Sequence, residues 1–343
     1  MKSKTLIIGD IHFRNFPMFP EYLVCQVNTV ASLINRHAEE CDSVIFLGDI
    51  FHFRKQSATE LLAFKKLLNH ATFRGYEVHV LRGNHESESK GDDGITSLSV
   101  FERQGVNIYE HTEHLNTKGW SFIPHYENED LIKAGLESVP ENNTVFGHFG
   151  YRGSINSFGD HDCDVPIELF KNQTVLGHVH HYSWKDRVLV LGTPYSTDFT
   201  EANKKNFYAI LDENHTLTRH EIDFGIRHYV VSEEALKANA EEIKDPKYGT
   251  LLRVFINSLE AVDTRAFRKK IFEEYDPIWV DVKYAPVIND KEGISSYSHG
   301  PSGVLTISDD LLTQYVDENN TGLDKDDIMK GLEKLKTDAS EEN

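Results

Sequence analysis

Short apolar runs alternate with helical patterns in the first part of the chain. Residues 5–8 form a short apolar run of the kind found in buried strands, and residues 43–47 and 76–81 are predicted as two further strands. Between them, residues 21–38 and 58–70 carry apolar side chains at the three- and four-residue spacing of amphipathic helices. Because strands that alternate with helices usually build parallel sheets, the pattern predicts the α/β class.

Strands predominate in the middle of the chain. Further short strands are predicted at 106–109, 119–123, 143–146, 173–176, 187–191 and 206–211. We therefore expect a second sheet packed on the first.

The pattern changes again after residue 227. A strand at 251–256, a helix at 263–274 and a strand at 278–284 predict a small α/β unit. Residues 289–303 are rich in glycine and serine, as linkers are, and an acidic tail with one or two short amphipathic helices follows them. The predicted parts of the chain are residues 1–226, 227–290 and 291–343.

Composition and charge narrow the function. The chain has 343 residues, a hydrophobic fraction of 39% and a net charge of −19. This charge argues against a protein that grips nucleic acid by bulk electrostatics, but divalent ions at a carboxylate-rich site would invert the local field. No apolar run is long enough to span a membrane, and the first strand leads directly into polar motifs that a cleaved leader would remove. We expect a cytoplasmic protein.

Glycine-flanked polar clusters follow several of the predicted strands. They contain Asp10-Ile11-His12, Gly48-Asp49, Gly83-Asn84-His85-Glu86, Gly147-His148 and Gly177-His178-Val179-His180. Singly, most are weak signals, since an aspartate after a strand is more often a turn or helix-cap residue. Together they supply oxygen and imidazole ligands without thiolate, a set suited to Mn²⁺, Fe²⁺ or Zn²⁺ with some tolerance of Mg²⁺.

The order of these clusters resembles that of the calcineurin-like metallophosphoesterase superfamily. The resemblance implies a two-sheet αββα sandwich and two divalent ions per chain, with Mn²⁺ expected and Mg²⁺ an alternative. One ion would be held by Asp10, His12 and His180. The other would be held by Asn84, His148 and His178, and Asp49 would bridge the two.

A finer resemblance rests on Gly48-Asp49-Ile50-Phe51-His52 with Arg54, and on Gly192-Thr193-Pro194. These segments are similar to the SbcD-type DNA double-strand-break nucleases. The small second unit and the acidic tail resemble the recombination nuclease subunits of T-even-like phages. The resemblance implies a DNA exonuclease or endonuclease, a homodimer, an SbcC-like SMC-type ATPase bound by the tail, and the cytoplasm of a phage-infected bacterium.

Two histidines are candidates for catalysis rather than metal binding. His85 follows a predicted ligand and could protonate the leaving 3′-oxygen, although it could instead only orient its neighbours. His52 could contact the phosphate or hold His85, and its alternative is an ordinary surface histidine.

The sequence indicates the substrate less clearly than it indicates the metal ligands. Arg54, Arg268 and Lys269 could contact DNA phosphates, but the last two could equally belong to a solvated helix face. Two rival functions stay open: a small-molecule phosphodiesterase or phosphomonoesterase of the same superfamily, and a non-catalytic scaffold on this fold.

Overall fold

The computed structural model describes part of the chain, namely residues 3–90, 96–154, 163–238, 240–244, 248–256 and 263–284. Two compact units divide the chain at Tyr297 and Ser298, and all described residues belong to the first unit. The predicted linker and tail helices of residues 291–343 therefore lie outside the described residues.

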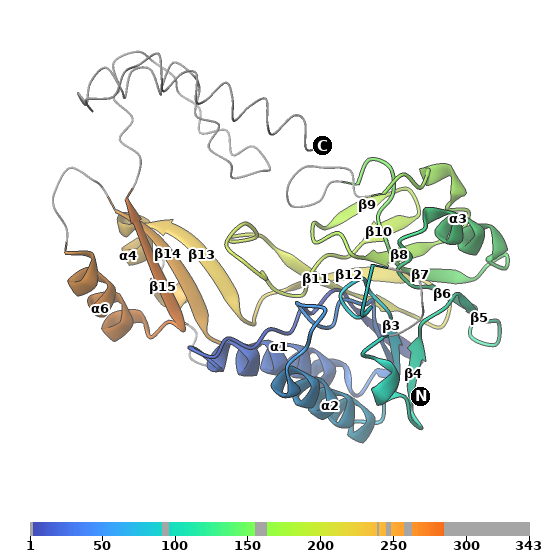
Figure 1. Cartoon of the computed structure of the whole chain (residues 1–343), viewed down its shortest axis with the longest axis horizontal. Coiled ribbons are helices and arrows are strands. Elements are labelled where there is room, and N and C mark those ends of the chain that lie inside the picture. Colours follow the sequence, from blue (N-terminus) through green and yellow to red (C-terminus); the bar gives the residue numbers. More distant parts are fainter. Residues whose placement is uncertain are drawn as a thin grey trace, which may run out of the picture. The chain divides into compact units, whose positions relative to one another are not determined.

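The first sheet has the strand order β12-β11-β1-β2-β3-β4 (Figure 1). Its parallel part comprises β1 (Lys4–Ile8), β2 (Cys41–Phe46), β3 (Glu77–Leu81) and β4 (Val106–Tyr109). Antiparallel pairing adds β11 (Asn206–Leu211) and β12 (Leu217–Ile222). The connecting helices α1 (Glu21–His37) and α2 (Ala58–Phe73) cover one face of this sheet, and the short 3-10 helix η1 (Ser99–Phe101) precedes β4.

The second sheet has the order β5-β6-β7-β8-β10-β9. Its parallel centre contains β6 (Trp120–Ile123), β7 (Thr144–His148), β8 (Thr174–Gly177) and β10 (Val188–Val190). The short antiparallel edges are β5 (Glu113–Leu115) and β9 (Ser183–Lys185). Helix α3 (Glu129–Ser138) and the 3-10 helix η2 (Ile167–Leu169) lie on its outer face.

Alternation of side chains along the strands builds the layers. In β1, Leu6 and Ile8 pack against the helices, whereas Ile7 faces the space between the two sheets. In β7, Phe146 faces the same central space, and Val145 packs on the outer side with α3. Both faces of each sheet are thus apolar, which is the αββα sandwich expected from the resemblance.

A third, fully parallel sheet follows. It consists of β13 (Arg227–Ser232), β14 (Thr250–Ile256) and β15 (Trp279–Tyr284), with α4 (Glu233–Ala238), α5 (Ala240–Ile243) and α6 (Thr264–Tyr275). It has an apolar cluster of its own around Leu252, Val254 and Val280. Tyr248 and Leu251 also pack in the α1 and α2 cluster, so this sheet is joined to the sandwich by apolar contacts. The predicted boundaries between parts of the chain stay predictions.

The N-terminus of α2 is tied to the loop that follows β1. The Ser57 hydroxyl accepts from the Glu60 N–H at 3.3 Å, while Glu60 accepts from the Ser57 N–H at 2.6 Å, which completes a capping box. The second Glu60 oxygen accepts from the Asn15 N–H at 2.9 Å. One buried carboxylate therefore fixes both a helix end and a loop.

Among the described residues, no helix combines the length and the apolar composition that crossing a bilayer requires.

The capping box gives a prediction about stability. Ser57→Ala should lower the free energy of unfolding by about 1 kcal/mol, because the Glu60 N–H loses its acceptor. Denaturant unfolding followed by circular dichroism measures this. Thr59→Ala, an exposed change in the same helical turn, is the control and should cost nothing. Equal stability of the two variants would contradict the role of the cap.

Candidate metal centre

The polar clusters meet because their strands end at one edge of the sandwich. Parallel strands place their carboxyl ends together, so the segments after β1, β2 and β3 become neighbours. The His12 N–H donates to the Asp49 carbonyl at 2.9 Å, which locks the first two segments side by side. The second sheet supplies His148 at the end of β7 and His178 after β8. All of the predicted metal ligands come together at this edge.

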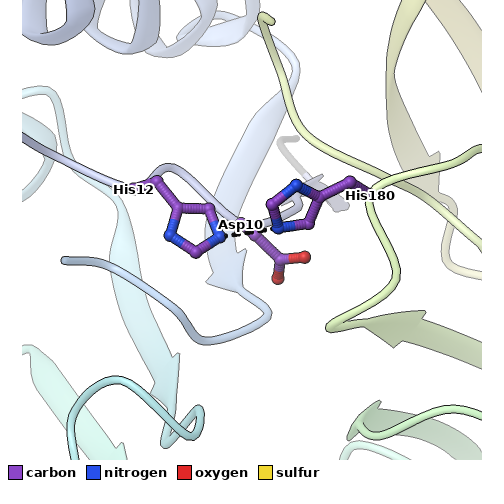
Figure 2. Close-up of side chains that lie close together, drawn as sticks. All are labelled: Asp10, His12 and His180. Atoms are coloured by element: carbon purple, nitrogen blue, oxygen red, sulfur yellow. Dashed lines mark hydrogen bonds between the residues drawn. The ribbon is translucent and has the colours of Figure 1, made fainter. Parts of the chain in front are cut away.

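One group of ligand atoms consists of Asp10, His12 and His180 (Figure 2). The Nε2 atoms of the two histidines lie 2.8 Å apart, and the Asp10 carboxylate lies beside them. Asp10 Oδ2 accepts from the His178 N–H at 2.8 Å, whereas Oδ1 is buried and has no hydrogen-bond partner among the described residues. An unpartnered carboxylate oxygen beside two imidazole nitrogens fits a divalent cation.

A second group consists of Asp49, His148 and His178, with Asn84 beside them. His148 Nδ1 donates to the Leu47 carbonyl at 2.7 Å, which leaves its Nε2 as the lone-pair nitrogen. That Nε2 lies 3.2 Å from Asn84 Oδ1, and His178 Nδ1 lies 3.0 Å from the same oxygen. Two imidazoles and an amide oxygen therefore converge on one point.

The side-chain amide of Asn84 lies close to both oxygens of Asp49. One of its two terminal atoms lies 3.1 Å and 3.2 Å from the two carboxylate oxygens. If that atom is the nitrogen, it donates hydrogen bonds to Asp49. If it is the oxygen, a cation between the oxygens would offset their repulsion. The amide can therefore serve either as a donor to Asp49 or as a neutral oxygen ligand of a metal.

Asp49 stands between the two groups. Its Oδ2 lies 3.7 Å from His12 Nε2, whereas its Oδ1 lies 3.3 Å from His148 Nε2. Asp49 also belongs to a third possible ligand group, with His12 and His85. A carboxylate whose two oxygens face different ligand groups has the geometry of a bridge between two ions.

The electrostatics of the site are unbalanced without cations. Burial and the neighbouring Asp49 charge hold the pKa of Asp10 well above its usual range. Burial opposes ionisation of Asp49 too, but the neighbouring His148 holds the pKa of Asp49 well below its usual range. Burial lowers the pKa of His12, so this imidazole is neutral and can offer a lone pair. Two buried carboxylates beside these imidazoles suit a pair of divalent ions, whose own charges would dominate the site.

Glycines beside the ligands provide room for carboxylates. A Cβ on Gly83 would lie 2.2 Å from Asp49 Oδ1, and a Cβ on Gly177 would lie 2.5 Å from Asp10 Oδ1. Three predicted ligands also adopt positive φ, namely His12 (43°), Asp49 (44°) and His178 (78°). Such strained backbone costs on the order of 1–3 kcal/mol per residue and is common at functional sites.

The two histidines predicted to act in catalysis lie at the rim. His85 Nδ1 donates to the backbone carbonyl of His52 at 2.5 Å, and the His85 N–H donates to Asp49 Oδ1 at 3.0 Å. His85 is therefore oriented with Nε2 on its other side, and 30% of its side chain is exposed. The His52 ring centroid lies 6.3 Å from that of His85, so the hydrogen bond between them uses the His52 backbone rather than its imidazole.

Two carboxylates, those of Glu86 and Glu201, fix the position of neighbouring groups of the site by hydrogen bonds. The buried Glu86 accepts from the Gly83 and Phe51 N–H groups, which ties two of the motif segments together. Glu201 accepts from His180 Nδ1 at 2.5 Å and from the Thr197 N–H at 2.7 Å. Burial opposes the His180 charge, but the bond to Glu201 raises the pKa of His180 to about 9.

The sequence analysis missed Glu201 and also His125. The His125 ring lies 5.4 Å from that of His178, and both of its nitrogens are buried without a hydrogen-bond partner among the described residues. His125 follows the end of β6, so the rule that pointed to the other clusters could have found it. Glu201 follows no strand end and no glycine, and its sequence carries no comparable signal.

The predicted DNA contacts are placed differently from one another. Arg54 donates to the Ser89 carbonyl at 2.8 Å and to Glu127 at 3.2 Å, so its guanidinium already has partners inside the protein. Arg268 and Lys269 are exposed on α6, with the Lys269 ammonium 3.6 Å from Glu273. Their contact with DNA stays a prediction.

Replacement of Glu201 tests the metal site without a substrate. Glu201→Gln should weaken Mn²⁺ binding about 10- to 100-fold, because His180 loses the carboxylate that orients it and raises its basicity. Titration calorimetry of the metal-free protein measures this. Glu221→Gln, which removes an exposed ion pair with Lys205, should bind Mn²⁺ like the unchanged chain. Equal affinity in both variants would refute the support assigned to Glu201.

Comparison with known proteins agrees with this geometry. The chain matches the family described as calcineurin-like phosphoesterase over residues 3–204. The DNA double-strand break repair protein Mre11 of Nanoarchaeum equitans (strain Kin4-M) is 22% identical over 240 residues, which cover 60% of this chain. The alignment spans 65% of that relative's length.

Two solved structures also show similarity to the chain. TT1561 of Thermus thermophilus has 12% identity and a TM-score of 0.38, over 64% of this chain and 99% of that chain. The cold-active protein-tyrosine phosphatase of a psychrophilic Shewanella species has 16% identity and a TM-score of 0.32, over 64% and 80%. Since the family match covers more than half of the sequence, the chain belongs to the calcineurin-like phosphoesterase family of metal-dependent hydrolases.

Proposed function

We propose that this protein is a two-metal DNA nuclease that hydrolyses phosphodiester bonds at DNA ends. The observation that carries the proposal is the position of Asp49, whose two oxygens face two separate imidazole groups. Similarity to a DNA double-strand break repair protein supports DNA as the substrate.

The metal ligands divide into two sets. Asp10, His12 and His180 would hold one ion, Asn84, His148 and His178 would hold the other, and Asp49, whose oxygens face both sets, would serve both. When bound, such a pair polarises the phosphoryl oxygens and makes a water molecule more acidic. The absence of thiolate among the ligands favours Mn²⁺, with Mg²⁺ as the alternative.

His85 is assigned the role of general acid. Its Nδ1 proton is committed to the His52 carbonyl, so Nε2 is the atom that can reach the substrate. In the imidazolium form, Nε2 donates its proton to the leaving 3′-oxygen and stabilises the charge that develops there. Hydrolysis then releases a 5′-phosphate.

His52 is assigned a separate contact with the phosphate. Burial and the nearby Arg14 and His85 charges lower the pKa of His52 to about 4. At neutral pH it is therefore an uncharged imidazole, which suits hydrogen bonding to a phosphoryl oxygen rather than charge neutralisation.

The remaining proposals concern the partners and the small α/β part of the chain at residues 227–290. Residues 227–290 form a DNA-binding cap, with Arg268 and Lys269 on its exposed helix. The tail at 291–343 binds an SbcC-like SMC-type ATPase, and two chains form a homodimer that acts in recombination and break repair. These assignments rest on the sequence resemblance together with the Mre11 relative.

Replacement of His85 separates catalysis from metal binding. His85→Ser should retain Mn²⁺ and lose about 10²- to 10⁴-fold in DNA cleavage, the usual contribution of a general acid. A Mn²⁺ titration and a nuclease assay on linear DNA measure the two effects. His220→Ser, at an exposed histidine of β12, is the control. Undiminished cleavage by the His85 variant would remove it from the reaction.

The nuclease assay also distinguishes the DNA nuclease from a small-molecule phosphoesterase. The acidic balance of −19 favours a small substrate over a polyanion. If the unchanged chain hydrolyses a nitrophenyl phosphate ester with Mn²⁺ but leaves DNA intact, the small-molecule phosphoesterase replaces the nuclease. A chain that binds no metal and cleaves neither substrate would be a scaffold.

Replacement of His52 should have a different signature. His52→Ala leaves the backbone carbonyl in place, so His85 keeps its orientation. We expect cleavage to fall about 10- to 100-fold, less than for His85→Ser, because a contact is lost but the acid remains. If the two variants have equal defects, His52 acts through His85 and not on the phosphate.

A further inference from the structure

An exposed aromatic ring stands beside the candidate metal centre. The Phe53 side chain is 49% exposed, and its ring lies 4.5 Å from the ring of His52. The His52 ring lies in turn 5.7 Å from the ring of His12. Single exposed apolar residues are common on protein surfaces, so the neighbours of Phe53 decide what the ring is for.

A second neighbour of the Phe53 ring is the Arg14 guanidinium, a cation without a paired anion. The Arg14 guanidinium carbon lies 4.9 Å from the Phe53 ring centroid and 4.1 Å from that of Phe16. In the described part of the chain, the Arg14 side chain forms no hydrogen bond or ion pair, and its Nε is buried without a partner. A bound anion would relieve this imbalance.

The backbone fixes these side chains in place. The Arg14 N–H donates to Gln26 Oε1 at 2.9 Å, and Gln26 Nε2 donates to the His12 carbonyl at 3.0 Å. The Phe13 N–H donates to the Ile50 carbonyl at 2.8 Å, and the His52 N–H donates to the Phe13 carbonyl at 3.1 Å. The two loops thus run side by side as extensions of β1 and β2. The positions of Phe53 and Arg14 along the backbone are therefore fixed before any ligand binds.

We propose that Phe53 and Arg14 form a platform for the nucleotide next to the scissile phosphate, with its base stacked on Phe53 and its outer phosphate paired with Arg14. The proposal rests on the nuclease function proposed above. An internal base of a duplex has both faces covered by its neighbours, so stacking on Phe53 favours a nucleotide that has left the stack at a strand end. The platform therefore selects single-stranded or frayed ends, and it tolerates any sequence because every base has a π-face.

Two strands of equal length and charge test the platform. One is a single-stranded oligonucleotide, and the other carries abasic nucleotides throughout. Phe53→Ala should lower kcat/KM on the first strand about 5- to 100-fold, the loss expected for one stacked base, and leave the abasic strand unchanged. Phe53→Trp should restore activity on the first strand. Phe73→Ala removes a ring that is 86% exposed at the far end of α2 and is the matched control.

A binding measurement gives a readout apart from turnover. An oligonucleotide that contains 2-aminopurine should lose fluorescence on binding to the unchanged chain in EDTA, because the base stacks on Phe53. This quenching should be absent with Phe53→Ala and present with Phe73→Ala.

The outcomes separate the two proposals. If Phe53→Ala weakens cleavage of both strands equally, or of neither, the platform is wrong although the nuclease stands. If the unchanged chain cleaves no DNA but hydrolyses a nitrophenyl phosphate ester, the nuclease function fails and the platform fails with it.

Discussion

One buried carboxylate, that of Asp49, organises the site. Ionisation of a group enclosed in protein is expensive, and Asp49 keeps its charge only because imidazoles and N–H groups surround it. The requirement extends outward, since each imidazole must then be held in the tautomer that presents a lone pair. The Leu47 carbonyl does this for His148, and Glu201 does it for His180. The centre therefore depends on partners that approach no metal themselves.

The sandwich explains why such a site can exist here. Parallel strands end at a common edge, where the chain leaves the sheet. Side chains beyond that edge no longer point alternately to the two faces of the sheet, so several of them can point toward one site. Each ligand group takes side chains from both sheets, so the apolar layer between the sheets sets how closely the ligands of one group approach one another. The apolar cluster that contains Ile7, Phe146 and Val175 is thus part of the geometry of the site.

The sequence predicted the parts of the molecule whose chemistry is local. Strand β11 is mostly apolar and largely buried, and the bounds of both β4 and β11 agree with the predicted 106–109 and 206–211. Strand β12 was not predicted, because only its end residues, Leu217 and Ile222, are buried. Helix α3 was not predicted, because few of its positions face the core. The convergence of the ligands was foreseeable from strand ends, whereas the contact between Glu201 and His180 joins a loop to a loop and depends on tertiary structure.

The carboxylate of Glu60 has a wider consequence. It closes the capping box of α2 and, with its other oxygen, holds the backbone of Asn15, next to Arg14. Damage at the start of that helix would be transmitted to the loop at the mouth of the site. A genetic screen could therefore recover Glu60 variants that fold well but have low activity, although Glu60 is not among the residues assigned to metal binding or catalysis. Such variants would be easily misread as evidence of a binding surface on the helix.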